Sequence, residues 1–164
     1  MTKPGLPIEI PGFGSREIRA IFSDYTGTLA FGGKLVPGVK DRLLKLSEVV
    51  DIHVVTSDSF GTARGQLRGI PVTLKILEGE NHDVQKREYV QELGPRYVAA
   101  FGNGNNDRLQ LGAVKQAGGL AIAVDVGEGI ALDAMMNAHL LVSGILNGLD
   151  LLLDPNRCKA TLRF

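Results

Sequence analysis

The sequence has little cysteine, no surplus of charge and no long apolar run. The single cysteine, Cys158, excludes an intramolecular disulfide, which fits a reducing compartment, and no base near it in sequence would make it a nucleophile. Lys plus Arg and Asp plus Glu number 18 each, so no charge excess indicates nucleic acid or an acidic membrane. No run approaches the ~20 apolar residues of a membrane span, and no signal-peptide core is present. We therefore expect a cytoplasmic protein without nucleic-acid or membrane partners.

The 164 residues, 44% of them apolar, are enough for one domain with a substantial core. Apolar, strand-like runs alternate with segments of helical periodicity, and the connections are short. Strands are expected over 18–23, 52–55, 72–77, 97–101, 120–124 and 139–142, and helices after Gly38 and over 60–68, 82–93, 109–116, 130–137 and 145–153. This alternation predicts a doubly wound, mostly parallel, Rossmann-like α/β sheet.

We expect this single α/β domain to occupy residues 1–164. Residues 1–14 are expected to form an N-terminal extension or an edge strand that turns back at Pro11-Gly12, and residues 155–164 a tail. The Phe31-Gly32-Gly33 segment indicates a small hairpin or flap.

Polar side chains follow three of the expected strands. Because the carboxyl ends of parallel strands meet at one edge of a sheet, these side chains are expected to converge. A lone strand-end aspartate more often caps a turn or a helix, but the convergence of three such ends favours a reaction site. The residues are Asp24 with Thr26, Thr56 with Ser57 and Asp58, and Asn103 with Asp107.

Phosphoryl transfer through an aspartyl phosphate is the chemistry that needs this set of groups. A carboxylate such as Asp24 attacks phosphorus and forms a covalent intermediate. The attack brings two anions together, so Mg²⁺ with oxygen ligands is required. A hydroxyl and backbone N–H groups must hold the phosphoryl oxygens, and a lysine must neutralise the charge that develops on them.

Four segments resemble, in order, the motifs of the haloacid dehalogenase-like (HAD) hydrolase superfamily. Asp24-Tyr25-Thr26-Gly27-Thr28 resembles D-x-D-G-T and, with threonine third, is more similar to the D-K-T-G-T loop of P-type ATPases. The segment 54–58 resembles V-T-G-D, Lys86 stands where the family's lysine does, and 102–107 resembles G-D-G-x-N-D. The stretch 122–138 is similar to the segment that follows in those pumps. The resemblance spans about residues 18–153 and implies a capless HAD-like core of the soluble P-type-ATPase-like branch, without membrane or actuator segments.

The resemblance also implies a role for each matching residue. The catalytic residues would be Asp24 as nucleophile, Thr26 and Lys86. The phosphate would be held by Thr56 and Lys86, assisted by the backbone N–H groups from Tyr25 to Gly27 and of Ser57. The Mg²⁺ ion would be held by Asp24, the Thr26 carbonyl, Asn103 and Asp107.

Two positions depart from the phosphatase pattern. Most phosphatases of the superfamily have a general acid–base aspartate where Thr26 stands, and threonine cannot exchange a proton near neutral pH, which forfeits roughly 10²–10⁴-fold in rate. Asn103 replaces the usual metal-binding aspartate and offers one charge fewer, so either Asn103 or Asp107 could be the main third ligand. We expect weak metal affinity, slow turnover, or both.

Two functions stay open on this evidence. The first is a Mg²⁺-dependent phosphohydrolase, phosphatase or ATPase-like, that acts through Asp24 on a phosphorylated small molecule or macromolecule. Without a cap its site is open, and enclosure by a second copy in a homo-oligomer is plausible. The alternative is a catalytically weak or inactive HAD-fold regulatory or binding protein, which Thr26 and Asn103 favour. The presence of Lys86 and Asp107 favours the enzyme.

Other candidates rank lower. His53 lies within an expected strand, and His82 and His139 lack metal-ligand spacing. No G-x-x-x-x-G-K-[S/T] phosphate loop is present. Gly127-Glu128-Gly129 is interpreted as a turn.

Overall fold

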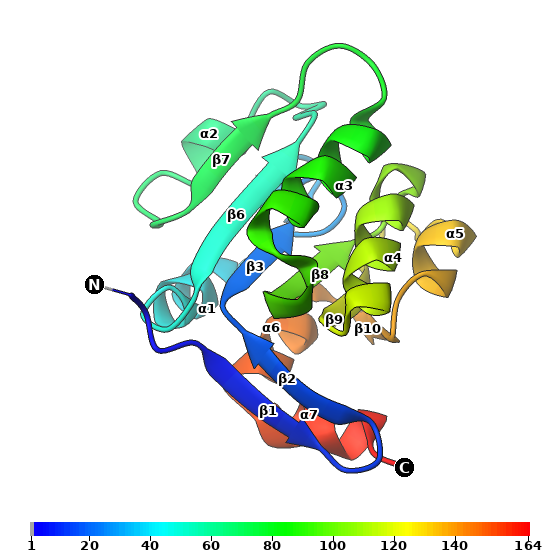
Figure 1. The fold of residues 1–164 in the computed structure, drawn as a ribbon. Coiled ribbons are helices and arrows are strands. Elements are labelled where there is room, and N and C mark those ends of the chain that lie inside the picture. Colours follow the sequence, from blue (N-terminus) through cyan, green and yellow to red (C-terminus); the bar gives the residue numbers. More distant parts are fainter. Residues whose placement is uncertain (1) are drawn as a thin grey trace.

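The computed structural model describes residues 2–164; Met1, the first residue of the expected N-terminal extension, lies outside them. The centre of the fold is a six-stranded sheet in which all neighbouring strands run parallel, in the order β10-β9-β8-β3-β6-β7 (Figure 1). The strands are β3 (Ala20–Ser23), β6 (Asp51–Thr56), β7 (Thr73–Ile76), β8 (Val98–Gly102), β9 (Leu120–Asp125) and β10 (Leu140–Ser143). The expected fold class is confirmed.

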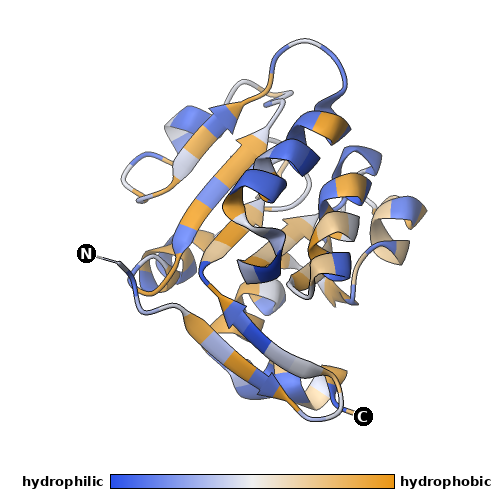
Figure 2. Ribbon diagram, in the orientation of Figure 1, coloured by the Kyte–Doolittle hydropathy of each residue, from blue (hydrophilic) through white to orange (hydrophobic). Residues whose placement is uncertain are grey.

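Helices cover both faces of this sheet. Figure 1 shows α3 (His82–Leu93), α4 (Arg108–Ala117) and α5 (Leu132–Met136) in front of it, while α1 (Val39–Leu46) and α6 (Ile145–Leu153) pack against the other face. Alternate residues of the central strands enter two apolar clusters: on β9, Ile122 faces the α1/α6 side and Ala123 the α3/α4 side. In Figure 2 the strands are mainly hydrophobic, whereas the outward side of α3 is hydrophilic. No helix in residues 2–164 combines the length and apolar character needed to cross a membrane.

The first expected strand, 18–23, is divided between two sheets. Ile18 ends a hairpin of β1 (Leu6–Ile10) and β2 (Gly14–Ile18), an antiparallel pair that turns at Pro11-Gly12 as expected. The central strand β3 starts only at Ala20. Arg19 marks the change of partner, because its N–H donates to the Tyr97 carbonyl and its carbonyl accepts from Asp51.

Two further segments differ from expectation. Residues 155–164 are not a tail: α7 (Pro155–Leu162) begins with proline at its first position and with the Asp154 carboxylate accepting the Asn156 N–H, and Cys158 is buried in the core. The helix expected over 60–68 is reduced to α2 (Ala63–Gln66), since the Asp58 carboxylate accepts the N–H groups at the helix start.

Short elements complete the edges of the fold. The expected flap is a hairpin of β4 (Ala30–Phe31) and β5 (Lys34–Leu35). Two 3₁₀ turns, η1 (Pro95–Tyr97) and η2 (Asn105–Asp107), precede β8 and α4 respectively. The flap and η2 both stand at the carboxyl edge of the sheet, because each follows a central strand.

Candidate active site

The structure brings the three polar strand ends together. Strand β3 lies between β6 and β8, with Ser23 opposite Val54 on one side and Phe101 on the other. Asp24, which follows β3, is therefore flanked by Thr56 at the end of β6 and Asn103 just beyond β8. The site is built on three adjacent strands of the buried sheet, which fixes its backbone.

Lys86 joins the carboxylates of this site. Its side chain leaves α3, is completely buried, and places Nζ 3.1 Å from Asp24 Oδ1 and 2.8 Å from Asp107 Oδ1. The same ammonium lies 3.4 Å from the Asn106 side-chain oxygen. Three donors thus meet three acceptors, which is how a buried charge is satisfied.

The charges of the site shift the pKa values of its groups. Burial raises the pKa of Asp24 to about 6; Lys86 opposes this rise and Asp107 adds to it. Burial alone would lower the pKa of Lys86, but Asp107 and Asp24 raise it by more, so the ammonium stays charged. Two carboxylates face one ammonium, so their negative charge exceeds that of Lys86 and a further cation would be attracted to the site.

Asp107 acts as an anchor for the loop around it. One of its oxygens accepts Lys86, and the other accepts the N–H groups of Asn103 at 3.1 Å and Gly104 at 3.0 Å. The approach is so close that a Cβ at Gly102 would lie 2.6 Å from Asp107 Cγ. Because both oxygens are engaged and the side chain is fully buried, the geometry favours Asn103 over Asp107 as the residue that offers an oxygen to a metal.

The remaining donor set fits a weakly held Mg²⁺. Asp24, the Asn103 amide and the Thr26 carbonyl offer oxygen ligands, which this ion prefers. Within residues 2–164 the Thr26 carbonyl accepts no hydrogen bond, and the buried Thr26 hydroxyl has no partner. No group of three His, Cys, Asp or Glu side chains in the described part of the chain could hold a metal. One carboxylate with neutral oxygens gives low charge, hence low affinity.

Gly27 is required where two loops meet: residues 24–28, called the nucleophile loop after the role expected of Asp24, and residues 102–107, called the metal loop after the role expected of Asn103. Its φ is +74°, and a Cβ would lie 3.0 Å from the Asn103 Cγ atom. The Asn103 amide therefore packs directly on the nucleophile loop, and the Thr28 hydroxyl donates to its oxygen at 3.4 Å.

The expected phosphate ligands differ in whether their donor groups are already engaged in hydrogen bonds within the protein. The Thr56 hydroxyl accepts the Asp58 N–H at 3.0 Å and keeps its own hydrogen for another acceptor. The Gly27 N–H already donates to the Ala30 carbonyl at 3.0 Å, so it is engaged in the turn. The Tyr25 side chain is buried and donates its hydroxyl to the Gly33 carbonyl at 2.9 Å, which ties the flap to the nucleophile loop. Ser57 is partly exposed beside Thr56.

Sequence reasoning gave no role to three residues that touch this site. Asn106 lies within 102–107 and Thr28 within 24–28, two of the segments that resemble the family motifs, so their position in the sequence could have indicated them. Glu128, whose carboxylate accepts the Gly32 N–H, is 96 residues away in the chain and carries no such signal.

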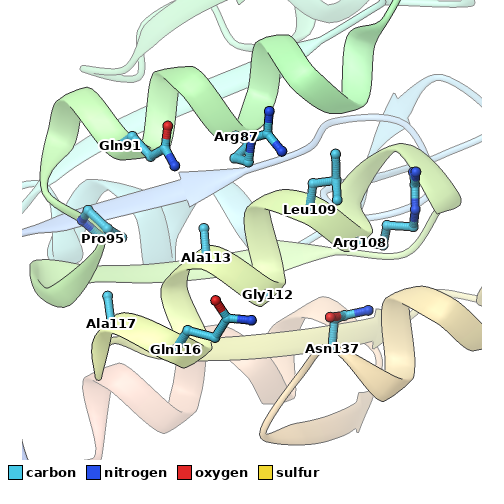
Figure 3. Close-up of a pocket in the computed structure, with 10 residues that line it drawn as sticks. All are labelled: Arg87, Gln91, Pro95, Arg108, Leu109, Gly112, Ala113, Gln116, Ala117 and Asn137. Atoms are coloured by element: carbon cyan, nitrogen blue, oxygen red, sulfur yellow. The ribbon is translucent and has the colours of Figure 1, made fainter.

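A further groove lies away from this site. A hollow of about 630 Å³ runs between α3 and α4, with Arg87, Gln91, Gln116 and Asn137 among its lining side chains (Figure 3). It contains none of the expected site residues. A smaller groove of about 400 Å³ reaches the Lys86 cluster, because Asn106 lines it.

Solved structures that are similar to this chain include HAD hydrolases. The 3-deoxy-D-manno-octulosonate 8-phosphate phosphatase of Yersinia pestis aligns with a TM-score of 0.61 at 18% identity, covering 96% of each chain. The corresponding phosphatase of Moraxella catarrhalis, solved with magnesium, phosphate and the KDO molecule, gives 0.60 at 17%, covering 88% of this chain and 90% of its own. A haloacid dehalogenase-like hydrolase of Streptococcus pneumoniae gives 0.57 at 14%, covering 81% and 97%. The chain has the HAD fold, as the motifs predicted.

A closer relative comes from sequence. No family model matches the chain. Over 90 residues, however, it is 40% identical to the uncharacterized protein MJ0073 of Methanocaldococcus jannaschii, covering 55% of this chain and 83% of that protein. The chain belongs to the same family as this archaeal protein.

The raised pKa of Asp24 predicts a stability gain when its charge is removed. Between pH 3.8 and about 6 the folded protein binds more protons at Asp24 than the unfolded chain, so this carboxylate reduces stability as the pH rises, fully so above pH 6. Without divalent cations, Asp24→Asn should be more stable than the parent at pH 7.5 by about 1–3 kcal/mol. The gain should shrink toward pH 4 in urea unfolding curves.

Asp133→Asn, which changes an exposed carboxylate on α5, serves as the matched control and should leave stability unchanged. Equal or lower stability of Asp24→Asn at pH 7.5 would contradict the pKa argument.

Proposed function

We propose that the protein is a Mg²⁺-dependent phosphohydrolase that acts through an aspartyl phosphate on Asp24. The observation that carries this proposal is the buried chain of contacts from Asp24 through Lys86 to Asp107 at the carboxyl edge of the sheet. The structural neighbours are hydrolases and phosphatases, one of them solved with magnesium and phosphate, which supports the same chemistry here.

The residues divide the work of the first step. Asp24 attacks phosphorus through a carboxylate oxygen, and the leaving group departs with the electron pair of the broken P–O bond. Lys86 holds Asp24 in place and neutralises charge on the phosphoryl oxygens, to which Thr56 donates its free hydroxyl hydrogen. A Mg²⁺ ion held by Asp24, the Thr26 carbonyl and Asn103 would supply charge neutralisation between the two anions.

The second step is expected to be slower. Water must attack the aspartyl phosphate and release phosphate, which restores the Asp24 carboxylate. Thr26 has no proton chemistry near neutral pH, so neither this water nor the leaving group receives help from that position. The phosphorylated protein should therefore accumulate. The similarity of residues 24–28 to the loop of P-type ATPases makes ATP a candidate phosphoryl donor.

The substrate is proposed only by class. No inserted domain covers the sheet edge within residues 2–164, where the flap is the sole hairpin between Asp24 and Thr56. Such an open site suits a phosphorylated macromolecule, or a small phosphorylated molecule enclosed by a second copy of the chain.

The alternative function, a weak or inactive regulatory or binding protein, rests on a specific observation. The site has one free carboxylate for a metal, because Asn103 stands where the resembled phosphatases have a metal-binding aspartate. It has no general acid, because Thr26 stands where they have the acid–base aspartate. Such a domain would bind phosphate or Mg²⁺ without turnover.

Activity measurements separate the two functions. We expect the parent to hydrolyse p-nitrophenyl phosphate, acetyl phosphate or ATP slowly with Mg²⁺. Asp24→Asn should lose this activity on the order of 10³-fold or more, because no other group replaces the nucleophile. Asp133→Asn should retain it. Activity that survives in Asp24→Asn refutes the mechanism, and a parent without activity on all three substrates favours the binding protein.

The charge at position 103 should set the Mg²⁺ requirement. Asn103→Asp adds the missing carboxylate, so the Mg²⁺ concentration for half-maximal stabilisation against heat should fall roughly tenfold. Asn105→Asp, which adds the same charge to an exposed neighbouring position, is the control and should change it little. Equal Mg²⁺ affinity of Asn103→Asp and the parent would sink the assignment of Asn103 as ligand.

A further inference from the structure

The loop between β9 and α5, residues 126–131, touches two parts of the candidate site at once. On one side the Glu128 carboxylate accepts the N–H of Gly32 at the tip of the flap. On the other, the Asn103 amide donates to the Gly129 carbonyl at 3.4 Å, and the Ala131 N–H donates to the Asn103 carbonyl at 2.8 Å. The flap and the metal loop, distant in sequence, are thus linked through a single short loop.

These contacts close a ring around the mouth of the site. The nucleophile loop holds the flap through the Tyr25 hydroxyl and the Gly33 carbonyl. The flap meets Glu128, the Glu128 loop meets Asn103, and Asn103 returns to the nucleophile loop through Thr28. Glu128 supplies the one side chain of the β9–α5 loop that reaches the flap by a hydrogen bond.

The loop is shaped so that Glu128 reaches the flap. Gly127 and Gly129 on either side have φ values of +107° and +90°, a conformation that other residues adopt only with strain. The Phe31 ring lies 3.4 Å from where a Cβ on Gly127 would stand, an ordinary packing distance, so the backbone conformation and not the space favours glycine here.

The second tip residue, Gly33, and the returning strand of the flap are held separately. The Thr62 hydroxyl donates to the Gly33 carbonyl, and the Leu35 N–H donates to the Gln66 side chain at 3.0 Å. Loss of the Glu128 contact would therefore free the Gly32 side of the tip, while Gly33 and Leu35 stay attached to Tyr25, Thr62 and α2.

We propose that Glu128 is a positioning residue that clasps the flap tip over the candidate active site and couples the flap to the loop carrying Asn103. Within residues 2–164 no inserted domain covers the sheet edge, and the clasped flap would cover the bound phosphoryl substrate instead. The coupling itself rests on contacts within the chain, whereas its catalytic consequence rests on the proposed phosphohydrolase function.

Hydrogen exchange of backbone amides tests the coupling without any substrate. In Glu128→Ala the Gly32 amide should exchange roughly three- to tenfold faster, because it loses a charged acceptor. The Ala131 amide and the 102–107 segment should also exchange faster, although no residue in them has been changed. Glu128→Gln, which keeps an acceptor oxygen, should restore most of the protection. Glu92→Ala, an exposed glutamate on α3, should match the parent.

Faster exchange confined to Gly32, or no change anywhere, overturns the coupling. For catalysis, Glu128→Ala should raise KM severalfold for the substrate that the parent hydrolyses and leave kcat within about twofold, since Asp24 and Lys86 are untouched. An unchanged KM with the exchange effects present overturns the role as a cover. If no variant hydrolyses any substrate, the proposed function fails, and the exchange data still decide the coupling.

Discussion

The site depends on one buried ammonium. Lys86 has no exposed surface and lies between two carboxylates, Asp24 and Asp107. A charge buried in this way is tolerable only if each of its donors finds an acceptor, so removal of an acceptor oxygen would leave one of these donors unsatisfied. Two features of the structure follow from this requirement. The Asp107 side chain must pack against Gly102 to reach Lys86, and α3, which carries Lys86, must start close to Asp24 at the end of β3. The sheet that supplies these positions is parallel throughout, so its carboxyl edge gathers all the groups concerned.

The same arrangement explains why the charged form of Asp24 is held in an unfavourable environment. Two carboxylates compete for Lys86, and burial disfavours the charge on Asp24, whose pKa rises to about 6. A free carboxylate in this environment gains from any cation that approaches it. The charged Asp24 therefore lowers the stability of the folded chain, a cost that its proposed role as nucleophile would explain.

Much of the fold and part of the site could be predicted from the sequence. The alternation of apolar strands and amphipathic helices predicted the parallel sheet. The strand-end residues Asp24, Thr56 and Asn103 lie side by side because the carboxyl ends of parallel strands lie at one edge of the sheet. Local chemistry explains the misses. Asp58 delays the start of α2 by accepting its first N–H groups, and Asp154 with Pro155 starts a helix where a tail was expected. The engagement of Asp107 by three donors, and the contact between Glu128 and Gly32, arise only from tertiary packing.

The central claim is that Asp24 accepts a phosphoryl group. The most direct measurement is to incubate the protein with acetyl phosphate or ATP and Mg²⁺, quench it in acid, and map the phosphorylated peptide by mass spectrometry. The account predicts a phosphate on Asp24 that hydroxylamine removes, in an amount that grows because Thr26 gives no help to its hydrolysis. A phosphate on another residue, or none on Asp24 with either donor under conditions where the folded protein binds Mg²⁺, would contradict the account.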